Sequence, residues 1–144
     1  MHECKYEFRG NGGGQWHYGD YEYDRCRNVS RIHTYFANGI YNKQVVVNNK
    51  SVGQYTGMTD KDGKRIFEGD IVEVYDFTSA YASKYKGVVR MVRGRWCVDH
   101  YDTIFESVFH TPLMFDDFAE RKTKVIGNTF ENPELIENIN NEEK

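Results

Sequence analysis

VGQYTGMTDKDGKRIFEGDIVEV, from Val52 to Val74, holds three turn signals and the start of a strand within a short stretch of chain. The signals are Tyr55-Thr56-Gly57, Lys61-Asp62-Gly63-Lys64 and Glu68-Gly69-Asp70. Glycine adopts at little cost the backbone angles that such turns require. From Ile71 to Val74 the side chains alternate between the two faces of a strand. We therefore interpret this stretch as the scaffold of a hairpin-rich β fold.

Glycine-containing turns also separate short β-type segments along the rest of the chain. Asn38-Gly39 is the strongest short-range signal for a hairpin, because both central residues of a type I′ turn need a positive φ. Aromatic residues make up 15% of the chain and prolines number only two, which favours strands over helices. We predict strands over residues 5–9, 15–23, 32–36, 43–47, 71–75, 87–93, 95–101 and 124–128, with loops at Gly10–Gly14 and at residues 76–84.

Two segments in the second half of the chain show helical features. The apolar residues between Ile104 and Phe109 have helical spacing, but Pro112 would end such a helix quickly, so residues 102–120 receive no assignment. Asn132-Pro133-Glu134 is a good helix start and predicts a short helix over residues 133–139.

These patterns predict a mainly β protein, either an SH3-like small barrel or coiled antiparallel sheets, with a short C-terminal helix. We divide the chain into a hairpin region, residues 1–50, and a barrel-like core, residues 51–144, with one continuous domain as the alternative.

Charge and cysteine content limit the classes of function. The net charge of −3 gives no bulk attraction to nucleic acids or anionic membranes. Cys4, Cys26 and Cys97 form no C-x-x-C pair, so they indicate no disulfide framework. No signal peptide pattern is present, and no apolar run approaches the roughly 18 residues of a membrane-spanning helix. We expect a cytoplasmic protein without membrane contact.

Two clusters of metal-ligand residue types have ordinary structural explanations. The first consists of Cys97, Asp99, His100, Asp102 and His110. On a strand Cys97 and Asp99 face one side and His100 faces the other, so the cluster does not converge without a bend. We expect Cys97 to be a small core residue.

The second cluster consists of Asp60, Asp62, Glu68 and Asp70. Its spacing fails the calcium-loop pattern, and such residues commonly hold turns by bonding to their own backbone. No serine lies in a G-x-S-x-G motif. We therefore expect neither a metal, nor a cofactor, nor an enzymatic activity.

A basic hairpin supports the most specific binding hypothesis. Basic residues and aromatic rings alternate around the turn predicted at Gly94, and small β folds use such surfaces to bind single-stranded nucleic acid. The candidate nucleic-acid-binding residues are Lys84, Lys86, Arg90, Arg93, Arg95 and Trp96. Basic residues also protect exposed sheet edges, which is the structural explanation of the same pattern.

Several motifs, in order along the chain, resemble the YopX family of phage and prophage proteins. They are FRG at 8–10, WHYG at 16–19, YTG at 55–57, EGD at 68–70, IGN at 126–128 and ENP at 131–133. The chain departs from the family pattern in its Gly10–Gly14 tip and in the loop over residues 78–84.

The resemblance implies an all-β core with small helical additions and assembly as a homo-oligomer. It implies no known biochemical activity and supplies no catalytic or binding residues. We expect a non-catalytic β module that binds itself or an unidentified phage or host protein. The alternative is a single-stranded or duplex nucleic-acid binder that uses the hairpin over residues 84–96.

Overall fold

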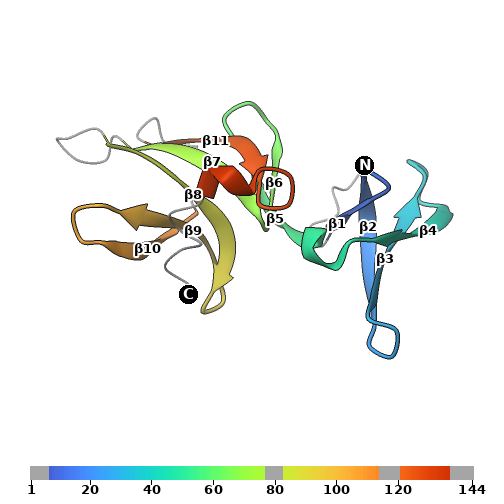
Figure 1. Cartoon of the computed structure of the whole chain (residues 1–144). Coiled ribbons are helices and arrows are strands. Elements are labelled where there is room, and N and C mark those ends of the chain that lie inside the picture. Colours follow the sequence, from blue (N-terminus) through green and yellow to red (C-terminus); the bar gives the residue numbers. More distant parts are fainter. Residues whose placement is uncertain (1–6, 77–82, 114–120, 137–144) are drawn as a thin grey trace. The chain divides into compact units, whose positions relative to one another are not determined.

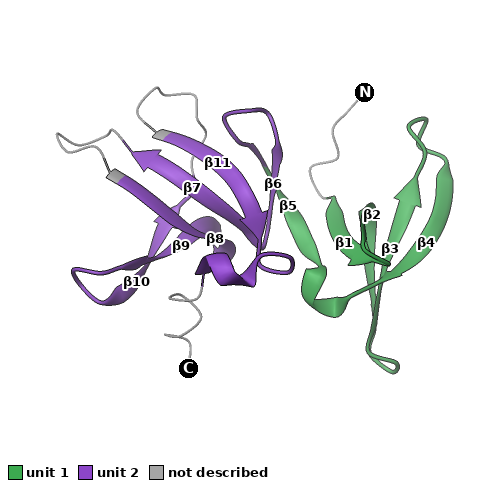
Figure 2. Cartoon of the chain, turned by 45° about the horizontal axis from the view of Figure 1, so that its top comes forward, with its two compact units in different colours: residues 1–57 green, residues 58–144 purple. Residues whose placement is uncertain are grey.

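The protein is mainly β and divides into two compact units (Figure 1). The computed structural model describes residues 7–76, 83–113 and 121–136. Unit 1 spans residues 1–57 and unit 2 spans residues 58–144 (Figure 2). The predicted mainly β fold class is confirmed, with two antiparallel sheets. In the part of the chain that the structure describes, no helix is long and apolar enough to cross a membrane.

Unit 1 is a curled antiparallel sheet. Its elements are β1 (Phe8–Gly12), β2 (Gln15–Asp24), β3 (Val29–Tyr35), β4 (Tyr41–Val47), the 3-10 turn η1 (Asn49–Ser51) and the start of β5 (Gly53–Thr59). The strand order is β4-β3-β2-β1-β5. The long strand β2 changes partner after Gly19, pairing first with β1 and then with β3. This change of partner lets the sheet curl, so that β1 approaches β4 as well.

Close backbone approaches explain why β1 and β2 are rich in glycine. A Cβ atom on Gly19 would lie 1.9 Å from the carbonyl oxygen of His33, and one on Gly10 would lie 2.6 Å from Val47 Cγ2. Asn48 at the end of β4 donates its backbone N–H to the carbonyl oxygen of Asn11. Glycine is therefore required where strands of the curled sheet meet.

Unit 2 is built on a five-stranded antiparallel sheet with the order β10-β9-β8-β7-β11. Its elements are β6 (Arg65–Phe67), β7 (Asp70–Asp76), β8 (Ser83–Val92), β9 (Arg95–Asp102), β10 (Ser107–Pro112), β11 (Arg121–Asn128) and the 3-10 turn η2 (Pro133–Ile136).

Each face of this sheet has an apolar cluster. We call the two faces the Val89 face and the Val88 face, after the neighbouring β8 residues that point to opposite sides. The cluster on the Val89 face consists of Val72, Val74, Val89 and Val98 with Ile66, Leu113 and Val125. The cluster on the Val88 face consists of Ile71 and Val88 with Ile136.

Asp60 ties the turn after β5 to strand β11. Its side chain is 6% exposed, and its Oδ1 accepts hydrogen bonds from the backbone N–H groups of Asp62 and Lys64, both at 2.9 Å. Its Oδ2 accepts from the N–H of Val125 at 3.0 Å, where the pairing of β11 with β7 shifts register. One buried carboxylate thus shapes a turn and satisfies a backbone donor distant in sequence.

Asp70 shapes the turn at Glu68-Gly69 that leads into β7. Gly69 has a φ of 88°, and the Asp70 carboxylate, which is 1% exposed, accepts from the Phe67 N–H at 2.8 Å. Gly69 also donates to the carbonyl oxygen of Val89 and accepts from the Thr129 N–H. The interpretation of Asp60 and Asp70 as turn residues is therefore confirmed.

Several predicted element boundaries were wrong. β1 continues through Gly12, so the first hairpin turns at Gly13-Gly14 rather than over the whole Gly10–Gly14 tip. β8 begins at Ser83, which places Lys84 on a strand instead of in the predicted 76–84 loop, and residues 77–82 lie outside the described ranges. The helically spaced apolar residues after 102 form a turn and the strand β10.

Two finer predictions about the fold are not confirmed. In the described residues, the five strands of unit 2 form an open sheet with β10 and β11 at its edges, and not a closed barrel. The predicted C-terminal helix is a 3-10 turn over Pro133–Ile136, and its remaining residues, 137–139, lie outside the described part of the chain.

Candidate functional site

The predicted nucleic-acid-binding residues are distributed over both faces of the β8–β9 hairpin and its turn. Lys84 and Lys86 lie beside Tyr75 and Glu73 of β7, on the Val88 face, and Arg90 follows them on the same side of β8. Arg93 lies in the turn, with a φ of 51°, and Arg95 starts β9. The structure therefore brings the two lysines together and separates them from the arginines at the tip.

Trp96 lies on the other face of the hairpin. It is half-buried and packs against the apolar cluster that contains Val89 and Val98. Tyr85, on the same face, stacks on His100 with a centroid separation of 4.1 Å. The structure therefore places Trp96 on the opposite face of the hairpin from Lys84, Lys86 and Arg90, because side chains alternate between faces along a strand.

Two of the predicted basic residues have acidic neighbours. Lys84 Nζ lies 3.3 Å from Glu73 Oε1 and 5.2 Å from the centre of the Tyr75 ring. Tyr75 donates its hydroxyl to Glu73 at 2.6 Å, and this bond, together with Lys84, holds the pKa of Glu73 below its usual value. Contacts with Tyr75 and Glu73 raise the pKa of Lys84. Arg90 lies 3.8 Å from the buried Asp99 carboxylate.

Strand β11 adds two lysines to the surface formed by Lys84, Lys86, Glu73 and Tyr75, and sequence patterns alone did not predict them there. Lys122 lies opposite Tyr75 and Lys124 opposite Glu73, so they flank β7 on the side away from Lys84 and Lys86. All four lysines are exposed. We call Lys84, Lys86, Lys122 and Lys124 the lysine face. No local signal predicts it, because the pairing of β11 with β7 joins segments that are far apart in sequence.

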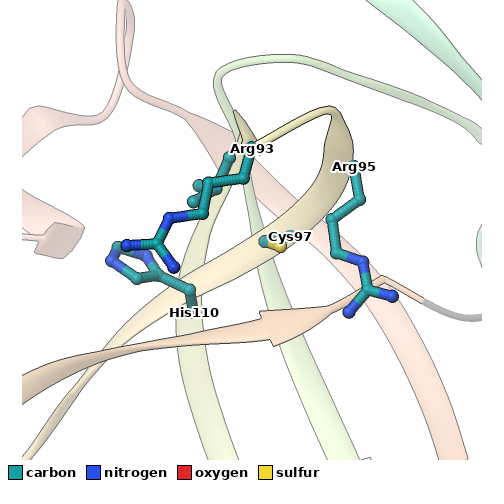
Figure 3. A pocket seen from close by; sticks show the side chains of 5 residues that line it. Arg93, Arg95, Cys97 and His110 are labelled. Atoms are coloured by element: carbon teal, nitrogen blue, oxygen red, sulfur yellow. The ribbon is translucent and has the colours of Figure 1, made fainter.

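An open pocket of about 530 Å³ lies beside the tip of the β8–β9 hairpin (Figure 3). The described residues that line it are Val92, Arg93, Arg95, Cys97 and His110. Arg93 extends over the pocket toward the His110 ring, and Arg95 lies on the other side of Cys97 (Figure 3). Cys97 is 2% exposed, and burial raises the pKa of its thiol, so a neutral sulfur forms this part of the wall.

Asp99 positions His110 beside this pocket. Its carboxylate is buried and accepts a hydrogen bond from His110 Nδ1, while its other oxygen faces Arg90. His100 is on the opposite face, where its Nε2 lies 2.9 Å from Thr111 Oγ1 and burial lowers its pKa. The predicted separation of Cys97 and Asp99 from His100 is therefore confirmed. Within the described residues, no group of three His, Cys, Asp or Glu side chains is arranged to hold a metal ion.

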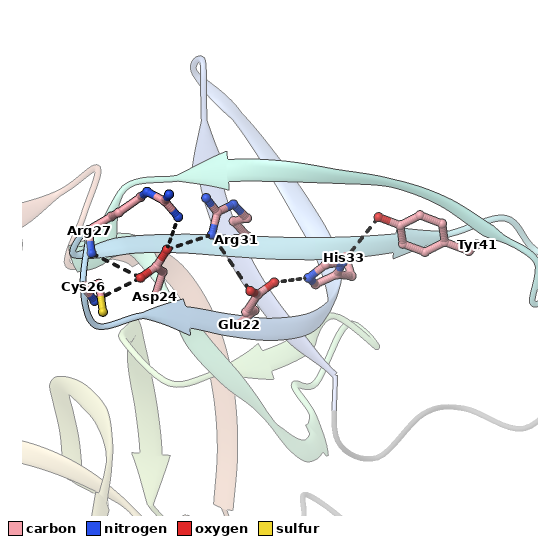
Figure 4. A network of polar contacts seen from close by, with 7 residues as sticks. All are labelled: Glu22, Asp24, Cys26, Arg27, Arg31, His33 and Tyr41. Carbon is pink, nitrogen blue, oxygen red and sulfur yellow. Dashed lines mark hydrogen bonds and ion pairs between the residues drawn. The ribbon is translucent and has the colours of Figure 1, made fainter.

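Unit 1 has a continuous polar network across β2, β3 and β4 (Figure 4). Glu22 accepts from His33 Nε2 at 2.6 Å, and His33 Nδ1 lies 3.3 Å from the Tyr41 hydroxyl. Arg31 lies within 4.0 Å of both Glu22 and Asp24. The backbone N–H of Arg27 holds the pKa of Asp24 below its usual value.

Exposed apolar side chains gather at the hairpin that joins β3 and β4. They are Tyr35 (45% exposed), Phe36 (55%), Ile40 (62%) and Tyr41 (49%). We call these four residues the apolar hairpin. Val46 is also exposed, but it pairs with Arg31 toward the other end of β4. Tyr35 and Tyr41 touch edge to face, with ring centroids 5.7 Å apart. A cluster of this kind on an outer strand is typical of an interaction surface.

Comparisons with known proteins identify the family. The family model described as "YopX protein" matches residues 7–137. The crystal structure of protein yopX from Bacillus subtilis is similar in fold, with a TM-score of 0.52 at 18% identity, covering 93% of this chain and 100% of that one. Protein EF1440 from Enterococcus faecalis aligns at 28% identity and a TM-score of 0.42, covering 92% and 75%. No curated protein sequence matches the chain. Because the family model covers nearly the whole sequence, the chain belongs to the YopX protein family.

Proposed function

We propose that this chain is a non-catalytic, phage- or prophage-encoded β module that assembles with a second copy of itself through the apolar hairpin of unit 1. The observation that carries the proposal is the exposure of four neighbouring apolar side chains there, from 45% for Tyr35 to 62% for Ile40. Aromatic residues are enriched at protein interfaces and charged residues are depleted at their centres. The occupant that best suits this surface is a second copy of the chain, in the cytoplasm of the host cell.

Charge compatibility supports a second copy as the occupant. The polar network beside the apolar hairpin pairs its acids and bases internally, as Glu22 with His33 and Asp24 with Arg27 and Arg31 (Figure 4). Two such surfaces related by a two-fold axis meet without a net like-charge repulsion. The Tyr35 hydroxyl is likewise bonded to Asp20 at 2.7 Å, which fixes this ring beside Tyr41.

Light scattering after size exclusion tests the self-assembly. The wild-type chain is expected to elute as a multiple of its 16.9 kDa monomer at micromolar concentration. Phe36→Ser combined with Ile40→Ser is expected to shift it to the monomer, because both side chains are more than half exposed and at the centre of the proposed contact.

The matched control is Ile104→Ser with Phe105→Ser, which removes two side chains that are 85% and 71% exposed in unit 2. It is expected to leave the mass unchanged. A monomeric wild-type chain would contradict the proposal. If the control variant dissociated and the Phe36→Ser, Ile40→Ser variant did not, the interface would lie in unit 2, and the proposal would also be contradicted.

The lysine face favours nucleic-acid binding as a second candidate function. Its four exposed lysines lie on the two strands that flank Glu73 and Tyr75 of β7. Contacts between lysines and phosphates supply sequence-independent affinity that falls with salt. The arginines at the hairpin tip, Arg93 and Arg95, extend the positive charge along β8 and β9.

A salt series of gel shifts with single-stranded DNA tests this candidate. Lys122→Glu with Lys124→Glu is expected to weaken binding and to reduce the slope of log affinity against log salt by roughly 1.4, since each single-strand phosphate contact contributes about 0.7. Lys43→Glu with Lys50→Glu in unit 1 makes the same charge change on other exposed lysines and is expected to have little effect. Equal weakening by both pairs would point to net charge alone and reject the lysine face.

A further inference from the structure

We propose that the pocket between Arg93, Arg95 and His110 binds the phosphate group of a free small molecule. This inference goes beyond self-assembly and uses residues of unit 2 only. The pocket has a volume of about 530 Å³, which is large enough for a phosphate together with a small organic group. Its described lining holds two guanidinium groups and one imidazole and no carboxylate.

The arrangement of these basic groups suits an oxyanion. Arg93 extends in the direction of the His110 ring, and both side chains line the open pocket (Figure 3). Arg95 lines the same pocket from the other side of Cys97. A planar guanidinium donates two parallel hydrogen bonds to phosphate, which favours arginine for this recognition.

The surrounding residues prepare His110 for this role. Asp99 holds its Nδ1, which leaves Nε2 as the ring nitrogen available to a ligand. The Asp99 carboxylate is buried and also faces Arg90 at 3.8 Å, so its negative charge is balanced within the sheet. Cys97 contributes a neutral thiol to the wall. No other lining residue competes for the arginines in the described part of the pocket.

The backbone at Arg93 supports the same conclusion independently. Arg93 has a φ of 51° and Gly94 a φ of 82°, the two positive values that a type I′ turn requires. Asn is the favoured residue at the first of these positions, and a bulky side chain there is strained. Strained residues of this kind gather at ligand-binding sites, where the side chain has a role that offsets the strain. The phosphate contact is that role.

Titration of the ¹⁵N-labelled full chain with inorganic phosphate, and separately with a nucleoside monophosphate, tests the proposal. Saturable shifts are expected at the amides of Arg93, Gly94, Arg95 and His110. Tighter binding of the nucleotide than of phosphate would identify an organic phosphate as the ligand, and equal binding would identify free phosphate. Arg95→Gln is expected to weaken both by about tenfold, the effect of losing a charge-assisted hydrogen bond.

Two further variants separate binding from folding. Arg93→Asn is expected to raise the melting temperature, because Asn suits the turn, and yet to weaken phosphate binding. Arg25→Gln removes an exposed arginine in unit 1 and is expected to leave binding unchanged. Absence of saturable shifts in the wild-type chain by about 10 mM phosphate or nucleotide would overturn the proposal. Unchanged phosphate affinity in Arg95→Gln would overturn the proposal too. Neither of these two results would contradict self-assembly, because the oligomeric state is measured separately.

Discussion

Replacing Asp60 with alanine is expected to lower the free energy of unfolding of unit 2 by about 3 kcal/mol. The carboxylate accepts three backbone hydrogen bonds, from Asp62, Lys64 and Val125, and its removal leaves the buried Val125 N–H without this acceptor. An unsatisfied buried donor costs about 1–3 kcal/mol, and the turn loses two further bonds. Asp60→Asn is expected to recover only part of this loss, since the amide group replaces one acceptor oxygen with a donor.

Urea titration of protein labelled with 5-fluorotryptophan shows whether the loss of stability occurs in unit 2. The chain has two tryptophans, Trp16 in unit 1 and Trp96 in unit 2, so the ¹⁹F spectrum reports on each unit separately. Asp62→Ala is the control, because its side chain is exposed, and it is expected to change stability by less than about 0.5 kcal/mol. Equal destabilisation by the Asp60 and Asp62 variants would contradict the assignment of Asp60 as the connection between the turn and β11.

Gly19→Ala is expected to lower the stability of unit 1 by about 3 kcal/mol, at the upper end of the usual cost of overpacking. A Cβ atom at this position would lie 1.9 Å from the His33 carbonyl oxygen, and neither backbone can move without breaking the pairing of β2 with β3. The same urea titration, followed at Trp16, measures the change.

Gly13→Ala separates the steric cause from the conformational one. Gly13 has a φ of 63°, but a Cβ atom there would meet no other atom within 4 Å. Its replacement is expected to cost only about 1 kcal/mol, the strain of a left-handed residue. If Gly13→Ala proved as destabilising as Gly19→Ala, the close contact with His33 would not be the reason for glycine in β2.

Local sequence signals predicted most of the turns, but Tyr55-Thr56-Gly57, predicted as a turn, lies within strand β5. Gly39, Gly63, Gly69 and Gly94 all have positive φ values, as the hairpin patterns around them require. These features depend on a few consecutive residues, so the sequence contains nearly all the relevant information. The same holds for Asp60 and Asp70, whose bonds to nearby backbone N–H groups follow from common turn chemistry.

Contacts between distant segments were not predictable in the same way. Lys122 and Lys124 reach the lysine face only because β11 pairs with β7, and His110 reaches the pocket only because β10 pairs with β9. Trp96 is different, since the alternation of Arg95, Trp96 and Cys97 along β9 already indicates that Trp96 shares a face with Val98. This alternation places Trp96 on the face opposite to the lysines of the hairpin.

The surfaces proposed for self-assembly and for phosphate binding belong to different units. The apolar hairpin lies in residues 35–41 of unit 1, and the basic pocket in residues 92–110 of unit 2. Substitutions in one surface should therefore leave the other property intact, because residues without shared partners have nearly additive effects. This separation allows each proposal to fail alone.

A spin label at position 40 tests the proposed interface most directly. Ile40→Cys would be labelled in a chain with Cys4→Ser and Cys26→Ser, while Cys97 is buried. Self-assembly through the apolar hairpin predicts a short distance with a narrow distribution between the labels on two copies, measured by pulsed electron resonance. A label at Ile104→Cys is expected to give a longer distance or a broader distribution. The absence of any distance between copies at position 40, or a shorter and narrower one at position 104, would contradict the account.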